Sequence, residues 1–282
     1  MPCLRCPDRD SAPRTFLTRR QVREVPEDGA VIEDISVRFF DSFKERKLLS
    51  PVMVEGLPGI GQVGKLVAEY MIHMLCAEKI AEIHSIYFPP HVIIEENGVV
   101  RLVRNELYLY HAENQDVVFL VGDYQSTSNE GHYILTDQYL EIAAELGIQR
   151  IYTLGGFGVG HFVDEPRVLG ALNRPELREE LEAAGVVFQR DEPGGGIVGA
   201  AGLLLGLGAL RNIDAVCLMG ETSGYLVDPR SATSVLSVLC SLLNVTVDPT
   251  QLNDRAAEME RMIEGLIEGE KIQSNDELSY IG

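Results

Sequence analysis

Hydrophobic and polar residues follow two patterns that alternate along the chain. Short continuous apolar runs, bounded by glycine or charged residues, are typical of strands buried on both faces of a sheet. Between them, apolar residues recur every three or four positions, which predicts helices. The main runs lie at 52–54, 117–121, 151–154 and 215–219, further short strands are predicted at 79–88 and 186–190, and the helical spacing covers 62–77, 131–147, 174–185 and 231–244. We therefore expect an α/β fold, a three-layer α/β/α domain with a mainly parallel sheet.

Two segments interrupt this alternation. Residues 91–110 contain two apolar runs around Asn97-Gly98, which is a strong signal for a β-hairpin inserted into the fold. The glycine-rich stretch 194–210 is shorter than the roughly 20 apolar residues that a membrane span requires. Its glycines recur at a spacing of four, which lets a neighbouring element approach closely. It therefore predicts a buried core helix.

The two ends of the chain lack these patterns, and a single domain lies between them. Residues 1–34 are polar and without periodicity, as in a disordered leader. Residues 35–265 show no break in composition, so we expect a single α/β/α domain that ends in an amphipathic helix. Residues 266–282 are expected to form a flexible tail. The apolar stripe of the last helix consists of Leu252, Ala256, Met259, Ile263 and Leu266.

Charge and cysteine content narrow the function classes. The 282 residues carry a formal net charge of −19, so nucleic acid and anionic membranes are poor partners. Three of the five cysteines lie in apolar surroundings, and no apolar signal segment precedes the domain, which together favour a cytoplasmic protein. Cys3 and Cys6 form one C-x-x-C without the second pair of a structural zinc site. We therefore assign no metal ligands.

The stretch GLPGIGQVGK at 56–65 matches the start of two phosphate-binding motifs. As a P-loop it lacks the Ser or Thr that would hold magnesium, because Leu66 stands there. As a dinucleotide fingerprint it lacks the acid that should end the next strand, in HSIYFPP. We therefore expect no nucleotide cofactor, and interpret the loop as a tight connection from a strand to a closely packed helix.

Four apolar strands end at glycine, and ligands of open α/β sheets bind beyond such strand ends. If the four strands are neighbours, their exits converge on one cleft. Glycine that only opens tight turns is the alternative interpretation. A metal bridging the three carboxylates of this cleft would offset their repulsion, but nothing in the sequence requires one. The candidate cleft residues are Glu55, Gly56, Gly59, Gly61, Gly64, Asp123, Gly155, Gly156, Glu221 and Thr222, and the strand exits also include Gly122 and Gly220.

No catalytic residue is assigned. GETSG at 220–224 has the form of a nucleophile elbow around Thr222. Such a nucleophile needs a positioned base. His161 follows a predicted strand-end loop and is the best placed of the six histidines, but the sequence does not bring it to Thr222. A structural turn is the favoured interpretation of GETSG.

The C-terminal tail carries apolar residues on a short polar segment. An apolar-aromatic end with a terminal carboxylate suits insertion into a pocket of a partner, where a lysine can pair with the carboxylate. An ordinary frayed terminus is the alternative. The predicted partner-binding residues are Leu278, Tyr280, Ile281 and Gly282.

Several motifs, taken in order, resemble those of the archaeal and bacterial proteasome assembly chaperone family, relatives of the second eukaryotic proteasome assembly chaperone subunit. They are EGLPGIGQVGKLVAEYMI, LVGDYQ, YTLGGFGVG, GGGIVGAAGLLLGLG and GETSGYLVDPRSA, and the resemblance covers about 50–245. It implies an α/β/α fold similar to nucleoside phosphorylases and related hydrolases. It also implies homo-oligomers that bind proteasome core α subunits without ATP.

In one respect the chain departs from that family. Members that bind the core particle can end in a hydrophobic residue, Tyr and any residue, whereas Tyr280 is third from the end here. The motif is either shifted in register or the tail has another role. The leading hypothesis is a non-enzymatic assembly chaperone or core-particle adaptor. The alternative is a small-molecule-binding protein or an enzyme, phosphorylase-like, hydrolase-like or ligase-like, that uses the strand-end cleft.

Overall fold

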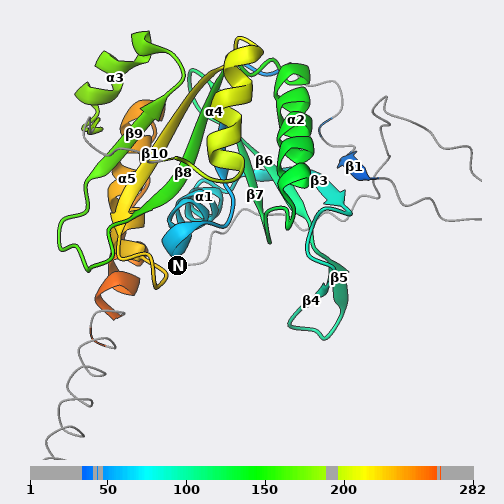
Figure 1. The fold of residues 1–282 in the computed structure, drawn as a ribbon, viewed down its shortest axis with the longest axis horizontal. Helices are drawn as coiled ribbons and strands as arrows, with labels where there is room; N and C mark the ends of the chain where they lie inside the picture. Colours follow the sequence, from blue (N-terminus) through cyan, green and yellow to red (C-terminus); the bar gives the residue numbers. More distant parts are fainter. Residues whose placement is uncertain (1–33, 41–42, 44–46, 189–195, 259–260, 262–282) are drawn as a thin grey trace, which may run out of the picture.

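The computed structural model describes residues 34–40, 43, 47–188, 196–258 and 261, which form an eight-stranded sheet between layers of helices (Figure 1). Four strands at the centre are parallel neighbours, and the strands outside them run antiparallel. The predicted α/β fold is confirmed, with its parallel part at the centre of the sheet. The spatial order is β1 (Ile35–Phe39), β3 (Glu78–Ser85), β6 (Asn105–His111), β7 (Asp116–Gly122), β2 (Val52–Gly56), β8 (Arg150–Gly158), β10 (Asp214–Thr222) and β9 (Val168–Leu172).

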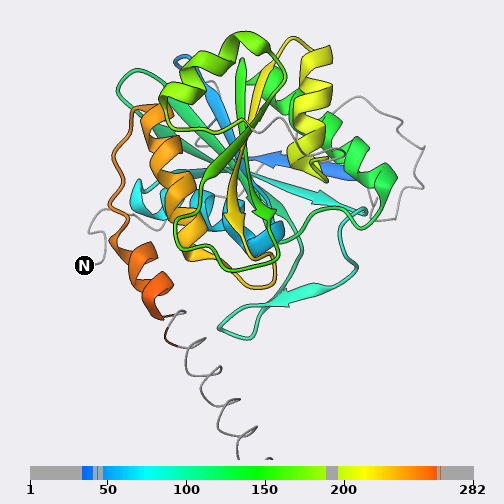
Figure 2. The same cartoon turned by 60° about the vertical axis from the view of Figure 1, so that its left-hand side comes forward.

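Helices cover both faces of this sheet (Figures 1 and 2). One face packs against α2 (Asn129–Glu145) and α4 (Ala200–Leu210), and the other against α1 (Val63–Met74) and α5 (Pro229–Leu243). The central strands therefore contribute side chains alternately to two cores: Met53 to the first and its neighbour Val54 to the second. Burial on both faces explains why these strands appear in the sequence as continuous apolar runs.

Local signals fix where the helices begin and end. The Ser128 side chain accepts a hydrogen bond from the Gly131 N–H (3.0 Å) at the start of α2. At the start of α5, Asp228 accepts from the Ser231 N–H (2.9 Å), and Pro229 occupies the first turn. Such caps satisfy backbone donors that have no partner within the helix. α5 ends at Leu243 and is capped by Asn244, which adopts the left-handed conformation.

The predicted hairpin is present but shorter than expected. β4 (Val92–Ile94) and β5 (Val100–Leu102) form a separate two-stranded sheet that projects from the domain (Figures 1 and 2). Asn97 and Gly98 make the turn, with Gly98 at φ +80° and the Asn97 side chain accepting from the Val99 N–H. The apolar residues that follow belong to β6, which pairs with β3 and β7 in the main sheet.

Three other elements differ from the sequence pattern. β1 and β9 are strands that the pattern did not indicate. The expected strand at 186–190 is reduced, within the described residues, to one bridge between Leu169 and Val187. Gly170 interrupts the apolar run of β9, because a Cβ there would lie 2.4 Å from Val186 Cγ1. The helix expected at 174–185 is present as η3 (Pro175–Leu177) followed by α3 (Arg178–Ala183).

The glycine-rich helix begins later than predicted. α4 starts at Ala200 rather than at 194, and its burial is one-sided: Leu204 is fully buried while Leu210 is 80% exposed. In the described part of the chain, no helix has the length and apolar character needed to cross a membrane. A final helix covers 250–258, where Leu252 and Ala256 of the predicted stripe are buried. Met259, Ile263 and Leu266 lie outside the described residues.

Candidate functional site

The carboxyl ends of the four parallel strands lie at one edge of the sheet. The order β7-β2-β8-β10 makes them direct neighbours, which satisfies the condition set by the sequence pattern. The loops at 57–62, 123–128, 159–167 and 223–228 follow these four strands. This is the edge at which ligands of open α/β sheets bind.

The glycines at two of the four exits lie inside the strands rather than beyond them. β8 continues to Gly158 and β10 to Thr222, so Gly155, Gly156 and Gly220 are sheet residues. A Cβ on Gly156 would lie 2.4 Å from the Ile60 carbonyl oxygen, and one on Gly220 would lie 2.2 Å from Ser231 Oγ. These glycines therefore permit close packing of a loop and a helix on the sheet.

The glycines of the loop at 56–65 also permit close packing. A Cβ on Gly56 would lie 2.4 Å from Ala68 Cβ, and one on Gly64 would lie 2.2 Å from the Leu154 carbonyl oxygen. Gly61, in η2 (Ile60–Gln62), has φ +61° and packs against Thr222. Gly59 is extended and open. The lack of side chains at these glycines thus lets the start of α1 pack directly on the sheet. This agrees with the interpretation of the loop as a tight connection from a strand to a closely packed helix.

Glu55, the last residue before this loop, is enclosed in the protein. Its side chain is 1% exposed, and its Oε1 accepts from the Leu57 N–H (3.0 Å). Its Oε2 has no hydrogen-bond partner among the described residues. Burial raises the pKa of Glu55 to about 8, although backbone hydrogen bonds oppose the shift. At neutral pH this carboxyl group is therefore mainly protonated.

Asp123 is held by an arginine from the hairpin. Arg101 donates to both carboxylate oxygens of Asp123 (2.6 and 2.9 Å), and the Arg104 N–H donates a third hydrogen bond (3.0 Å). Burial favours the neutral acid, but the hydrogen bonds from Arg101 and Arg104 outweigh it, so the pKa of Asp123 is lowered. Asp123 therefore anchors the hairpin as a carboxylate.

Glu221 is held by a different arginine. The Arg167 N–H and Nε donate to Glu221 Oε2 (3.1 and 3.0 Å), and Nη2 pairs with Oε1. The Arg167 hydrogen bonds lower the pKa of Glu221 despite its burial. Pairing of β9 beside β10 brings the two residues together, so the sequence could have indicated Arg167 only if β9 had been recognised.

Thr222 and His161 make separate contacts. Thr222 is fully buried and its Oγ1 accepts from the Gly224 N–H (3.4 Å). The His161 ring lies against its own loop, with Nδ1 3.0 Å from the Val159 carbonyl oxygen. Thr222 is thus the buried last residue of β10, and its Oγ1 contacts the backbone of the turn that follows.

The three candidate carboxylates thus have three different environments. Glu55 is enclosed, whereas Asp123 and Glu221 are each held by their own arginine. Across the residues that the structure describes, no group of three or more His, Cys, Asp or Glu side chains is suited to hold a metal ion. At these strand ends, one carboxyl group is therefore mainly protonated and the other two carboxylates are paired with arginines.

Exposed apolar side chains surround this edge. Gln125 connects two of its loops, because its Nε2 donates to the Pro58 carbonyl oxygen (2.7 Å) and its Oε1 accepts from the Ala200 N–H (3.0 Å). Gln125 was not predicted from the sequence, although its position three residues after the end of β7 marks the same edge. We name the exposed set the strand-end rim: Ile60, Phe162, Val198, Tyr225 and Leu226, each at least 44% exposed.

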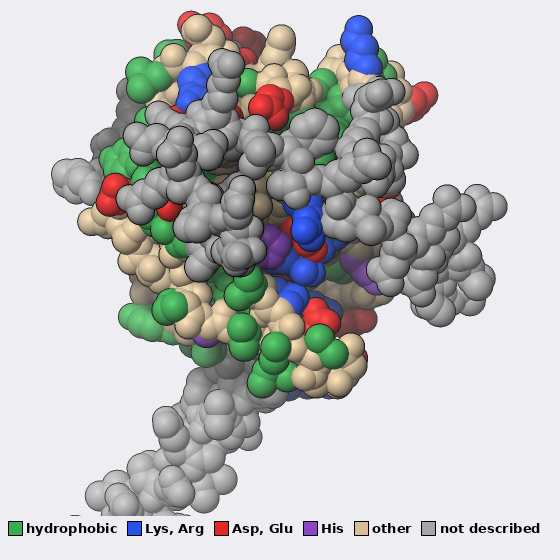
Figure 3. Space-filling model, turned by 90° about the vertical axis from the view of Figure 1, so that its right-hand side faces the viewer, with side chains coloured by type: hydrophobic (Ala, Val, Ile, Leu, Met, Phe, Trp, Pro, Cys, Tyr) green, Lys and Arg blue, Asp and Glu red, His purple; other side chains and the backbone are tan. Residues whose placement is uncertain are grey.

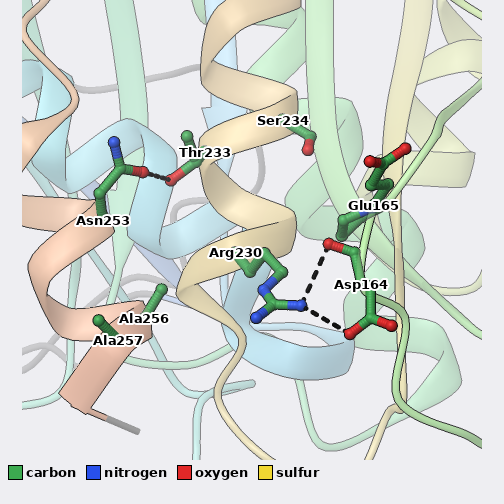
Figure 4. A pocket seen from close by; sticks show the side chains of 9 residues that line it. Asp164, Glu165, Arg230, Thr233, Ser234, Asn253, Ala256 and Ala257 are labelled. Carbon is green, nitrogen blue, oxygen red and sulfur yellow. Dashed lines mark hydrogen bonds and ion pairs between the residues drawn. The ribbon is translucent and has the colours of Figure 1, made fainter. Parts of the chain in front are cut away.

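A cavity of about 440 Å³ lies between the loop at 164–166, α5 and the helix at 250–258 (Figure 4). Arg230 Nη1 donates to Asp164 Oδ1 and to its carbonyl oxygen, both at 3.1 Å. Thr233 donates to Asn253 Oδ1 (3.2 Å) on the opposite wall. Two pairs of polar residues in the cavity wall thus contact each other. The predicted tail residues Leu278, Tyr280, Ile281 and Gly282 lie outside the described residues.

Comparison with known proteins identifies the family. Residues 53–267 match the model of the PAC2 family. An uncharacterized protein of Methanocaldococcus jannaschii is 39% identical over 244 residues, which cover 83% of this chain and 93% of that protein. The chain therefore belongs to the PAC2 family.

Solved structures agree with this assignment. PbaB of Pyrococcus furiosus, described as an archaeal proteasome activator, is similar with a TM-score of 0.79 and 37% identity, over 83% of this chain and 99% of PbaB. PbaA of the same organism, described as an archaeal homolog of proteasome-assembly chaperone, has a TM-score of 0.65 and 26% identity over 83% of this chain and 96% of PbaA. The resemblance to the proteasome assembly chaperone family is confirmed.

Proposed function

We propose that this chain is a non-enzymatic protein of the cytoplasm that binds the proteasome core particle without ATP, as an assembly chaperone or an adaptor. The observation that carries the proposal is the likeness to PbaB, which extends over nearly the whole of that protein. The proposed partners are the α subunits of the core particle, as the family resemblance implies. Homo-oligomers are part of the same proposal.

The strand-end rim is the surface that we assign to the partner. Loop 57–62 contacts the loop after β10, because a Cβ on Gly224 would lie 3.6 Å from Ile60 Cγ2. The loop after β8 joins them through a hydrogen bond from the Val159 N–H to the Thr222 carbonyl oxygen (2.8 Å). Exposed aromatic and aliphatic side chains on supported loops are suited to protein recognition.

The C-terminal tail is the second proposed contact, through Leu278, Tyr280, Ile281 and Gly282. The two contacts differ: the rim is a surface formed by loops of the domain, whereas we propose that the tail binds as a peptide segment in a pocket of the partner. A partner that uses both gains affinity through effective concentration.

The alternative, a small molecule or substrate bound at the strand ends, has less support. Such a site needs polar groups that converge on a ligand. Here the carboxylates of Asp123 and Glu221 are held by arginines, and Glu55 is enclosed. Among the residues that the structure describes at this edge, no contact favours a ligand over a protein partner.

Pull-down of proteasome α subunits tests the proposed contacts. We expect full-length protein to capture them, and removal of residues 276–282 or the substitution Tyr225→Glu to reduce capture at least tenfold. Leu210→Glu is the matched control, because Leu210 is equally exposed, at 80%, but lies at the far end of α4. If the truncated protein captures α subunits as well as the full-length protein does, the tail is not a contact. If Tyr225→Glu captures them equally well, the rim is not a contact.

A further inference from the structure

Three polar side chains form a row across the centre of the sheet. Glu55 of β2 pairs with Thr153 of β8, and Thr153 pairs with Cys217 of β10. Residues paired in this way on parallel strands point to the same face of the sheet, and their strands lie about 4.8 Å apart. That face is the one covered by α2 and α4, because Cys217 belongs to the core beneath these helices. The row is therefore a polar part of the hydrophobic core.

The row is sealed from solvent. The exposed fractions of Glu55, Thr153 and Cys217 are 1%, 0% and 0%. Charged side chains elsewhere gather at the surface, as Figure 3 shows for one side of the molecule. Tyr139 of α2 is close enough to interact electrostatically with Glu55, but its hydroxyl group is hydrogen-bonded to the Asn105 side chain (2.7 Å). The hydroxyl group of Tyr139 is therefore already engaged.

Two oxygen atoms of this row lack hydrogen-bond partners. Among the described residues, neither Glu55 Oε2 nor Thr153 Oγ1 makes a hydrogen bond, either to the other or to a third group. Buried polar atoms in folded proteins are almost always paired, with protein or with ordered water. Two unpaired atoms at paired positions of neighbouring strands thus point to one group that lies between them.

The proton of Glu55 defines what that group must do. Burial raises the pKa of Glu55 to about 8, and Oε1 accepts from the Leu57 N–H (3.0 Å), so the proton of the neutral acid sits on Oε2. Oε2 then needs an acceptor, whereas the Thr153 hydroxyl can accept or donate. Burial raises the pKa of the Cys217 thiol to about 12, against the effect of the Thr153 hydroxyl beside it, and a thiol is only a weak partner. A water molecule meets both requirements.

We infer that one water molecule is bound inside the core, between Glu55 and Thr153. The water accepts from the Oε2–H of Glu55 and donates to Thr153 Oγ1. By holding the proton on Oε2, it leaves Oε1 to accept from the Leu57 N–H, at the start of the loop that carries the rim residue Ile60. The water site therefore supports the position of loop 57–62, whatever binds at the rim.

The number of long-lived internal water molecules tests the inference. Magnetic relaxation dispersion of water oxygen measures this number for the full-length protein in solution. Thr153→Val keeps the shape and removes the hydroxyl, so we expect it to hold one such water fewer than the unmodified protein, whereas Thr153→Ser should keep it. Thr233→Val is the matched control, because the Thr233 hydroxyl already donates to the Pro229 carbonyl oxygen (3.0 Å), and it should leave the number unchanged.

A crystal structure of the unmodified protein gives the position of the water, and this test holds even if Thr153→Val does not fold. We expect one peak of electron density within about 3.2 Å of both Glu55 Oε2 and Thr153 Oγ1. A direct hydrogen bond between these two atoms, or no density between them, would overturn the inference. An unchanged water number in a folded Thr153→Val protein, or an equal loss in Thr233→Val, would also overturn it.

Discussion

At the scale of single residues, three acidic side chains at the strand ends show how surroundings decide chemistry. Arg101 and Arg167 keep Asp123 and Glu221 ionised, with their pKa values lowered. Glu55 has no cationic partner among the described residues, and burial raises its pKa to about 8. Asp123 thus holds the hairpin through Arg101, and Glu221 holds the start of edge strand β9 through Arg167. Glu55 is a mainly neutral group of the protein interior.

The raised pKa of Glu55 predicts a pH dependence of stability. Because the folded-state pKa lies above the unfolded value, its stabilising contribution is complete below pH 4.5 and is lost as the pH rises through about 8. The free energy of unfolding should fall by at most about 1.4 kcal/mol per pH unit between these values. Glu55→Gln keeps the shape and cannot ionise, so its urea midpoint should depend less on pH between 5.5 and 8.5. Equal slopes for both proteins would show that Glu55 ionises without penalty.

At the scale of elements, close approach explains the glycine loop at 56–65. α1 begins against β8 because Gly64 has no Cβ to contact the Leu154 carbonyl oxygen. Two phosphate motifs share this geometry, and a loop that serves only packing matches both of them in part. The loop and its helix are therefore a structural joint of the sheet.

Two glycine substitutions in this loop test whether close packing is what requires glycine. Gly64→Ala should lower the free energy of unfolding by about 3 kcal/mol, because the new Cβ would lie 2.2 Å from a backbone oxygen. Gly59→Ala should change it by less than about 0.5 kcal/mol, since the nearest atom to its Cβ would be 4.0 Å away. Urea unfolding measures both values. Similar effects of the two substitutions would contradict the packing account.

The arginine of the hairpin gives a second prediction at this scale. Arg101→Met removes the contacts with Asp123 and Glu95, so the amides of 92–102 should exchange with solvent several-fold faster. The rest of the domain should keep its protection. Arg178→Met is the control, because Arg178 makes an exposed pair with Glu182 on α3. Unchanged exchange in the hairpin would mean that Ile93 alone holds it in place.

The sequence predicted the elements whose signals are local. The central strands are buried on both faces, and the turn at Asn97-Gly98 has its own chemistry, so both were recognisable. β9 was missed because Gly170 breaks its pattern for a contact with Val186 that is distant in sequence. The pairing of Glu221 with Arg167 depends on that missed strand. The arginine partners of Asp123 and Glu221 are set by contacts distant in sequence, which residue type alone does not indicate.

At the scale of the whole molecule, the fold separates several surfaces. The strand-end rim lies at the carboxyl ends of the central strands, and the β4–β5 hairpin projects from the domain (Figure 1). The rim is apolar on a chain with net charge −19, and the ion pair of Arg167 with Glu221 neutralises an acidic group at the same edge. In the proposed function, the rim and the tail are the two contacts with the proteasome.

The most direct test of the central claim is binding of the full-length chain to purified proteasome core particle without nucleotide. Biolayer interferometry with immobilised core particle, at concentrations up to about 100 µM, covers the range of weak and tight complexes. The account predicts saturable binding that ATP does not alter and that falls at least tenfold in a chain combining Tyr225→Glu with removal of 276–282. Absence of saturable binding over this range, with the chain folded by circular dichroism, would contradict it.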